Sequence, residues 1–170
     1  MEKVFVKIVN KSENALPSYQ SDAASGVDLY ANLVSPDPGQ HVKYKGRDFN
    51  ALIKESGEVE IHLFPKGRIL IPTGIHVDIP AGYEGQVRPR SGRALKEGLT
   101  IPNSPGTIDS DYRGDVGVIL LNNSTETVVI KHGERIAQLV FTRVAKANFE
   151  VVEELSTTVR GEGGFGHTGK

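Results

Sequence analysis

Residues 65–89 read PKGRILIPTGIHVDIPAGYEGQVRP, and this stretch decides the fold class. Runs rich in β-branched residues are interrupted there by Pro or Gly every few positions. Helix interiors tolerate neither residue well, so the stretch excludes long helices. The runs themselves are typical of short strands. The same alternation extends through most of the chain and predicts an all-β sandwich or jelly roll with at most one short helix.

The strands that we expect lie between these breaks. They are Val4–Val9, Val27–Ala31, Val59–Phe64, Arg68–Ile71, Ile75–Ile79, Glu84–Arg88, Leu99–Ile101, Asp115–Leu121, Thr127–Ile130 and Ile136–Val144. The single helix is expected at Ser91–Glu97, with Ser91 as its N-cap. Two stretches differ: Pro36–Lys66 is polar and weakly periodic, and Ser156–Lys170 is rich in glycine with almost no apolar residue.

Length and composition exclude several classes of protein. A chain of 170 residues is the size of one domain. The absence of Cys excludes disulfides, Cys-ligated zinc and a thiol nucleophile. Lys and Arg total 20 against 21 for Asp and Glu, so no strongly basic surface for nucleic acid is implied. No apolar run is long enough to span a membrane, and no signal peptide is evident, so we expect a cytoplasmic protein.

Two segments in the middle of the chain could carry chemistry. Pro89–Ala94 joins a turn to the start of the predicted helix, and its free N–H groups, Ser hydroxyl and guanidinium suit an anion. An ordinary capped corner would look the same. Asn103–Gly114 places two carboxylates beside a Tyr and an Arg at a strand-turn-strand junction, where a carboxylate could deprotonate water. Alternatively, Asp111 and Arg113 pair across the turn.

Two further features are weaker. Asp28 lies among strand residues and either is solvated or helps to hold a hydrated Mg²⁺, which prefers few carboxylates together with water and phosphate oxygens. The glycine-rich tail combines an Arg, consecutive glycines and Phe165, which is a composition suited to a lid over a nucleotide. A frayed terminus explains the tail equally well.

Five segments taken in order resemble the trimeric deoxyuridine triphosphatases (dUTPases). The segments are Ser25–Ala31, Pro89–Gly92, Gly106–Gly114, Gly133–Leu139 and Arg160–Gly166. The resemblance implies a jelly-roll (β-clip) subunit over 1–155, a C-terminal lid over 156–170 and a homotrimer with two further identical subunits. Its three active sites would lie at subunit interfaces. The implied reaction is hydrolysis of dUTP to dUMP and pyrophosphate with Mg²⁺, which limits uracil in DNA and supplies dUMP for thymidylate synthesis.

The resemblance also assigns roles to individual residues. Asp109 would be the catalytic base that activates the attacking water, and Asp28 would bind Mg²⁺ indirectly through water. Asn103 and the backbone from Thr107 through Ile108 to Gly117 would read uracil, with Tyr112 under the deoxyribose. The residues expected at the phosphates and in the closing lid are Arg90, Ser91, Gly92, Gln138, Arg160, Phe165, Gly166, His167 and Thr168.

The chain departs from the family pattern in two places. The family usually continues with Ser-Thr after the last motif, whereas this chain has His167-Thr168, and His167 is our candidate for the replacement donor. Between the Asp28 motif and Pro72, the chain has an insertion of about 20 residues within 36–66, which we expect to form a β-hairpin.

Two alternatives share the fold. One is a non-catalytic nucleotide sensor or partner-binding protein that uses the insertion as its interface, although a pure binder has no need of Asp109. The other is a deoxycytidine triphosphate deaminase, which would need an acid/base Glu at the pyrimidine. The segment Ile108–Tyr112 resembles the hydrolase instead.

Overall fold

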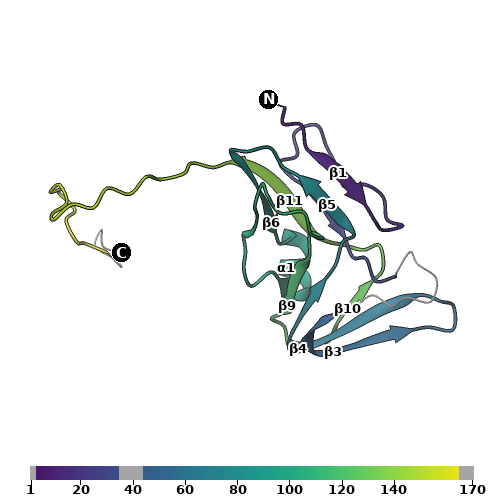
Figure 1. Ribbon diagram of the computed structural model, residues 1–170. Helices are drawn as coiled ribbons and strands as arrows, with labels where there is room; N and C mark the ends of the chain where they lie inside the picture. Colours follow the sequence, from purple (N-terminus) through teal and green to yellow (C-terminus); the bar gives the residue numbers. More distant parts are fainter. Residues whose placement is uncertain (1–2, 35–43, 165–170) are drawn as a thin grey trace.

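The computed structural model describes residues 3–34 and 44–164, which form a β-protein with one short helix (Figure 1). The elements in chain order are β1 Lys7–Asn10, β2 Val27–Tyr30, β3 Lys45–Ile53, β4 Val59–Ile71, β5 Ile75–Asp78, β6 Tyr83–Arg88, α1 Ser91–Glu97, β7 Leu99–Thr100, β8 Gly106–Ile108, β9 Val118–Asn122, β10 Val128–Lys131 and β11 Arg135–Arg143. The predicted all-β fold class with one short helix is confirmed.

The strands form three antiparallel sheets. One sheet has the order β2-β11-β6-β8, and a second has the order β10-β4-β9-β7 with β3 paired to β4. A third, two-stranded sheet joins β1 to β5. Strand β4 is the longest, and β3 pairs with it on one side while β10 and β9 pair with successive parts of it on the other.

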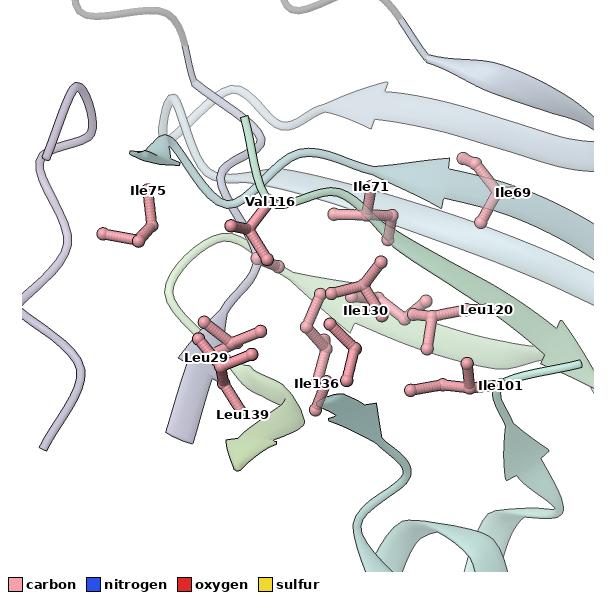
Figure 2. Packing of buried hydrophobic residues seen from close by; sticks show 14 of the residues in the cluster. Leu29, Ile69, Ile71, Ile75, Ile101, Val116, Leu120, Ile130, Ile136 and Leu139 are labelled. Carbon is pink, nitrogen blue, oxygen red and sulfur yellow. The ribbon is translucent and has the colours of Figure 1, made fainter. Parts of the chain in front are cut away.

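The core lies between the sheets. Leu29 and Leu139 from the four-stranded sheet point toward Ile71, Ile130 and other side chains of the larger sheet (Figure 2). These side chains are almost fully buried, and burying a side chain of this size stabilises the fold by about 1.5–3 kcal/mol. Buried hydrophobic side chains thus occupy the space between the two sheets.

The segment of the expected insertion contains a β-hairpin. Strands β3 and β4 are joined by a turn in which the Lys54 N–H donates to the Glu58 carbonyl at 2.9 Å. The inner residue of the turn, Gly57, has φ of +83°, which favours glycine. Figure 1 shows this hairpin beside β10 and projecting from one side of the molecule.

Several strand predictions were wrong in detail. The runs Val59–Phe64 and Arg68–Ile71 are one continuous strand, because Pro65 and Gly67 lie in a bulged region where Lys66 has φ of +62°. The bounds of strand β3 were not predicted, because nearly all its side chains are exposed and the sequence there lacks the apolar alternation of a half-buried strand. Strand β8 has only three residues, too few to show a period.

The predicted helix is present, but its N-cap was wrong. Ser91 is the first helical residue, and Arg90 occupies the N-cap position with extended backbone and no side-chain capping bond. The helix ends at Gly98, whose left-handed φ of +65° lets its N–H reach the carbonyls of Ala94 and Arg93. Gly98 marks the C-terminal end of the helix, whereas Ser91 does not mark its N-cap.

After β11, residues 145–164 leave the body as an extended arm (Figure 1). Its apolar side chains are open to solvent: Phe149 is 93% exposed and Val151 is 97% exposed. The described part of the arm forms no strand. The arm begins at residue 145, whereas we expected the lid to begin at residue 156. Within the residues described, no helix is long and apolar enough to cross a membrane.

An acidic side chain ties the hairpin together and makes its stability depend on pH. Glu60 is 6% exposed, accepts from Lys54 Nζ at 2.7 Å and lies 2.7 Å from His62 Nε2. The hydrogen bond from Lys54, followed by that from His62, lowers the pKa of Glu60. The Glu60 carboxylate therefore stabilises the fold above its unfolded pKa of about 4.3, and this contribution is lost as pH falls through the lower folded pKa.

We expect Glu60→Gln to lower the free energy of unfolding at pH 7 and to differ less from the wild type at pH 3. Urea denaturation at both pH values measures this difference, with the exposed Glu126→Gln as the matched control. A Glu60→Gln penalty that is the same at pH 7 and pH 3 would show that the ionised carboxylate is not the stabilising form.

Candidate functional site

A cavity of about 260 Å³ lies where β8 meets β4 and β9. Side chains of β4, β6 and β9 form its apolar wall, and the residues around β8 add polar groups at its rim. Its lining residues are Leu70, Val87, Ile101, Asn103, Gly106, Thr107, Ile108, Asp109, Tyr112, Asp115, Gly117 and Ile119. The cavity therefore brings together Asn103, Thr107, Ile108, Asp109, Tyr112 and Gly117 from the residues selected on the sequence.

Strand β8 forms the floor of this cavity as an edge strand. It pairs with β6 through the registers Gln86↔Thr107 and Val87↔Gly106. Among the strands that the structure describes, none pairs with its other side. An open strand edge presents backbone donors and acceptors in a fixed order, which a planar ligand with a complementary edge can match.

Two glycines keep the cavity open. A Cβ on Gly117 would lie 2.8 Å from Leu70 Cδ1, and one on Gly106 would lie 3.2 Å from Asn103 Nδ2 and 3.4 Å from Val87 Cβ. A larger residue at either position would push the wall into the space that a ligand needs. A glycine is therefore favoured at both positions because of the space beside it, and not only because glycine is common in turns.

The Tyr112 ring is held in place by its own loop. Its hydroxyl donates to the Asp115 carbonyl at 3.0 Å, and the ring lies so close to Gly114 that a Cβ there would be 2.5 Å from Tyr112 Cζ. The Asp115 carboxylate accepts from the N–H groups of Thr73 and Gly74, each at 3.0 Å. Sequence reasoning assigned no role to Asp115; its only signal was its position beside the Tyr112 motif.

Arg113 does not pair with Asp111, so that alternative was wrong. Its guanidinium pairs with Asp78 on β5 and donates to the carbonyls of Ser110 and Tyr112 at 2.7 and 3.0 Å. Asp78 is distant in sequence, and a local turn pattern could not identify it. The guanidinium therefore fastens the loop that carries Asp109 to the β1–β5 sheet.

A second group of selected residues lies around Asp28, which is 7% exposed on β2. Arg90 Nε contacts Asp28 Oδ1 at 3.1 Å, and Arg135 NH1 contacts Oδ2 at 3.0 Å. Two guanidinium groups thus neutralise one buried carboxylate and leave a net positive charge. Arg135 lies in a segment selected on the sequence, but its role there was missed because Asp28 was expected to face a metal.

The remaining residues of this group surround the start of α1. Gln138 Nε2 donates to the Pro89 carbonyl at 2.8 Å, which fixes the turn into the helix. Ser91 and Gly92 follow and are exposed. Arg90 uses Nε and NH1 in bonds to Asp28 and the Arg135 carbonyl, so part of its five-donor fork remains for an anion. None of these residues lines the cavity of the first group.

The donor set fits a magnesium ion only through water. Within the described ranges no three His, Asp or Glu side chains gather as a metal cage. Each Asp28 oxygen already accepts from an arginine, although a carboxylate oxygen can accept a second hydrogen bond. Such a site would suit Mg²⁺ bound to phosphate oxygens with several waters retained, and Asp28 could accept a hydrogen bond from one of those waters.

The described part of the tail, up to residue 164, does not line the cavity in this chain. Arg160 lies on the extended arm, and its Nε donates to the Gly163 carbonyl at 2.7 Å within the same segment. Phe165, Gly166, His167 and Thr168 fall outside the residues that the structure describes. The selected residues that the structure describes therefore form two groups, with Arg160 on a separate arm.

The cavity lies beside a strand edge and a carboxylate, and a separate arginine cluster lies around Asp28. This arrangement is a candidate site for a small anionic ligand in an all-β protein. A family model described as dUTPase matches residues 56–169, and the chain belongs to the dUTPase family. The protein is accordingly a dUTP diphosphatase. The match leaves the Asp28 segment outside its range.

Solved structures of phage enzymes are similar over almost the whole chain. The dUTPase of Staphylococcus bacteriophage 80alpha with dUpNHpp is 25% identical, with a TM-score of 0.71 over 98% of this chain and 99% of that one. The dUTPase of phage phi11 of S. aureus, described as showing a species-specific insert, is 21% identical, with a TM-score of 0.66 over 91% and 99%. A phi11 mutant described with a structural Mg(II) ion is 22% identical over 90% and 99%, with a TM-score of 0.66.

The contact between Gly114 and Tyr112 can be tested directly. We expect Gly114→Ala to displace the Tyr112 ring from the cavity and to lower kcat/KM for dUTP by about tenfold to a hundredfold. Ser110→Ala is the matched control, because only the Ser110 carbonyl takes part in the loop bonds. Equal kcat/KM in Gly114→Ala and the wild type would show that the ring position is unimportant for turnover.

Proposed function

We propose that the protein hydrolyses dUTP to dUMP and pyrophosphate at sites shared between three identical subunits. The observation that carries the proposal is the cavity on the open edge of β8, where Asn103, Asp109 and Tyr112 meet. The family assignment supports the substrate. In this role the enzyme limits uracil in DNA and supplies dUMP for thymidylate synthesis.

The cavity would hold the uracil and the sugar. Backbone groups of β8 and the Asn103 amide would match the uracil edge, and the close walls would exclude the methyl group of thymine. The Tyr112 hydroxyl is already bonded to Asp115, so the ring face remains to pack under the deoxyribose. A ring packed this closely leaves no room for a 2′-hydroxyl.

Asp109 would act as the catalytic base. Its side chain is exposed at the cavity rim, where it can reach a water beside the α-phosphate. The water oxygen forms a new bond to the α-phosphorus, the bond from that phosphorus to the bridging oxygen breaks, and Asp109 accepts the proton. Pyrophosphate leaves with the electron pair of the broken bond.

The phosphate chain would lie on the second group, with Arg90, Ser91 and Gly92 as its donors and Gln138 holding their turn. Bound Mg²⁺ would add positive charge at the phosphate oxygens, with Asp28 contacting one of its waters. Since the two groups are separate in one chain, we propose that they come from adjacent subunits. The exposed Phe149 and Val151 of the arm support an assembly in which the arm crosses to another chain.

The tail would close the third side of the site. Arg160 would contact the phosphates, Phe165 would stack on uracil, and Gly166, His167 and Thr168 would hold the terminal phosphate. We propose that 156–170 acts as this lid on the 1–155 domain.

Pyrophosphate release from dUTP, dCTP, dTTP and UTP with Mg²⁺ tests the proposed function. We expect release from dUTP alone. No release from any of the four would refute the hydrolase, and release from UTP at a comparable rate would refute the role of Tyr112 at the sugar.

Asp109→Asn should bind dUpNHpp as the wild type does but lose kcat by a factor on the order of a hundred to ten thousand. The amide keeps the size of the side chain and cannot take the proton. Calorimetry and single-turnover kinetics separate the two effects. A comparable loss of binding and rate would indicate that Asp109 is structural.

Deletion of residues 160–170 should leave a trimer by light scattering and reduce kcat/KM by at least about a hundredfold, because the phosphates lose Arg160 and their lid. The arm upstream of residue 160, which we expect to hold the subunits together, stays intact. Full activity of the shortened trimer would remove the tail from the mechanism, and a monomeric product would contradict our assignment of the arm.

Partner binding is a second candidate function that is compatible with hydrolysis. The dUTPase of bacteriophage 80alpha is one of the phage dUTPases described as controlling the transfer of virulence genes. In this chain the exposed β3–β4 hairpin is the candidate surface. Replacing Gly46–Glu58 by a short turn should preserve dUTP turnover if the hairpin serves only such a partner.

A further inference from the structure

Helix α1 carries the proposed phosphate residues but is not anchored by its own apolar packing in this chain. None of its side chains is buried, and Leu95 is 87% exposed. A helix of two turns is too short to be stable alone. Polar contacts must therefore set the position of its first residues.

Arg93 supplies most of these contacts. Its side chain is 12% exposed and lies between two carboxylates. NH2 contacts Glu97 Oε2 at 2.6 Å within the helix, and NH1 contacts Glu134 Oε2 at 3.1 Å in the turn between β10 and β11. NH2 also donates to the Val129 carbonyl of β10 at 3.3 Å. One guanidinium thus joins the helix to two other elements.

Glu134, which binds Arg93 from outside the helix, is itself held by a backbone hydrogen bond. Its Oε2 also accepts from the Lys131 N–H at 3.2 Å, so the turn is closed before Arg93 binds it. The planar guanidinium fork can bind both carboxylates and the carbonyl together, whereas an ammonium group is a point charge on a flexible stem. The arrangement therefore depends on Arg and not only on a positive charge.

We propose that Arg93 is a positioning residue that holds Arg90, Ser91 and Gly92 where the triphosphate binds. The inference rests on the proposed function and adds to it the group that fixes the phosphate segment. Arg93 directly follows Gly92 and contacts no proposed substrate atom. Its single positive charge also offsets part of the negative charge of Glu97 and Glu134, which would otherwise repel the phosphates more strongly.

If Arg93 has this positioning role, its substitution should weaken phosphate binding without weakening nucleoside binding. Deoxyuridine would use only the cavity on β8, whereas dUpNHpp would also use the segment before α1. We expect Arg93→Lys to weaken dUpNHpp binding by about tenfold, since it keeps the charge and loses the fork. Deoxyuridine affinity should change by less than about twofold. In turnover with dUTP, the effect should lie mainly in KM.

Isothermal calorimetry on the full chain with Mg²⁺ measures both affinities. Arg47→Lys on β3 is the matched control, because Arg47 is exposed and, among the residues that the structure describes, its side chain forms an ion pair only with the neighbouring Asp48, at 3.8 Å. Glu134→Asp is the second variant: it keeps the charge, withdraws the carboxylate from Arg93 and should weaken dUpNHpp binding in the same selective way. It serves in place of Arg93→Lys if that variant does not fold.

Unchanged dUpNHpp affinity in both variants would overturn the proposal. Equal losses for deoxyuridine and dUpNHpp would also overturn it, because they would indicate a general structural role. The failure of the proposed function would look different: the wild type itself would neither bind dUpNHpp more tightly than deoxyuridine nor release pyrophosphate from dUTP.

Discussion

The open edge of β8 is the constraint on which the candidate site depends. Buried hydrophobic side chains occupy the space between the sheets, and the cavity that gathers the candidate residues lies beside a strand edge where backbone groups remain unpaired. Strand β8 provides such an edge because β6 pairs with only one of its sides. Gly106 and Gly117 then keep the space beside it clear, and the loop from Asp109 to Asp115 closes one end.

The second group of residues, which we propose binds the phosphates, depends on a different interaction, the contact of the buried Asp28 carboxylate with Arg90 and Arg135. This contact orients Arg90 while its positive charge is only partly compensated. The short helix has no buried side chain, and its position is set by the hydrogen bond from Gln138 and the ion pair of Arg93 with Glu134. The chain thus holds a cavity of about 260 Å³ and an arginine cluster around Asp28 on separate elements. An enzyme that acts on a nucleoside triphosphate needs both together, which favours an assembly of several chains.

Much of the fold could be predicted from local sequence, because Pro and Gly spacing limits strand length and β-branched runs fill the gaps. Strand β3 and the continuity of β4 could not, since exposed strands lack alternation and a bulge around Pro65 resembles a break. The selected cavity residues lie in one segment, from Asn103 to Gly117, and were predictable as a set, whereas Leu70, Val87, Ile101 and Ile119 of the lining were not. Asp115, Arg135 and Arg93 act through partners remote in sequence, such as Thr73, Asp28 and Glu134, and pairings of that kind leave no local pattern.

The most direct test of the shared site is complementation between two inactive variants. Asp109→Asn and Arg90→Gln chains are each assayed alone and then co-refolded in equal amounts. If the two groups come from different subunits, random assembly restores an intact pair in about a quarter of the sites, and dUTP turnover returns to about that fraction of the wild type. Co-assembled chains that remain as inactive as the parents would contradict the account.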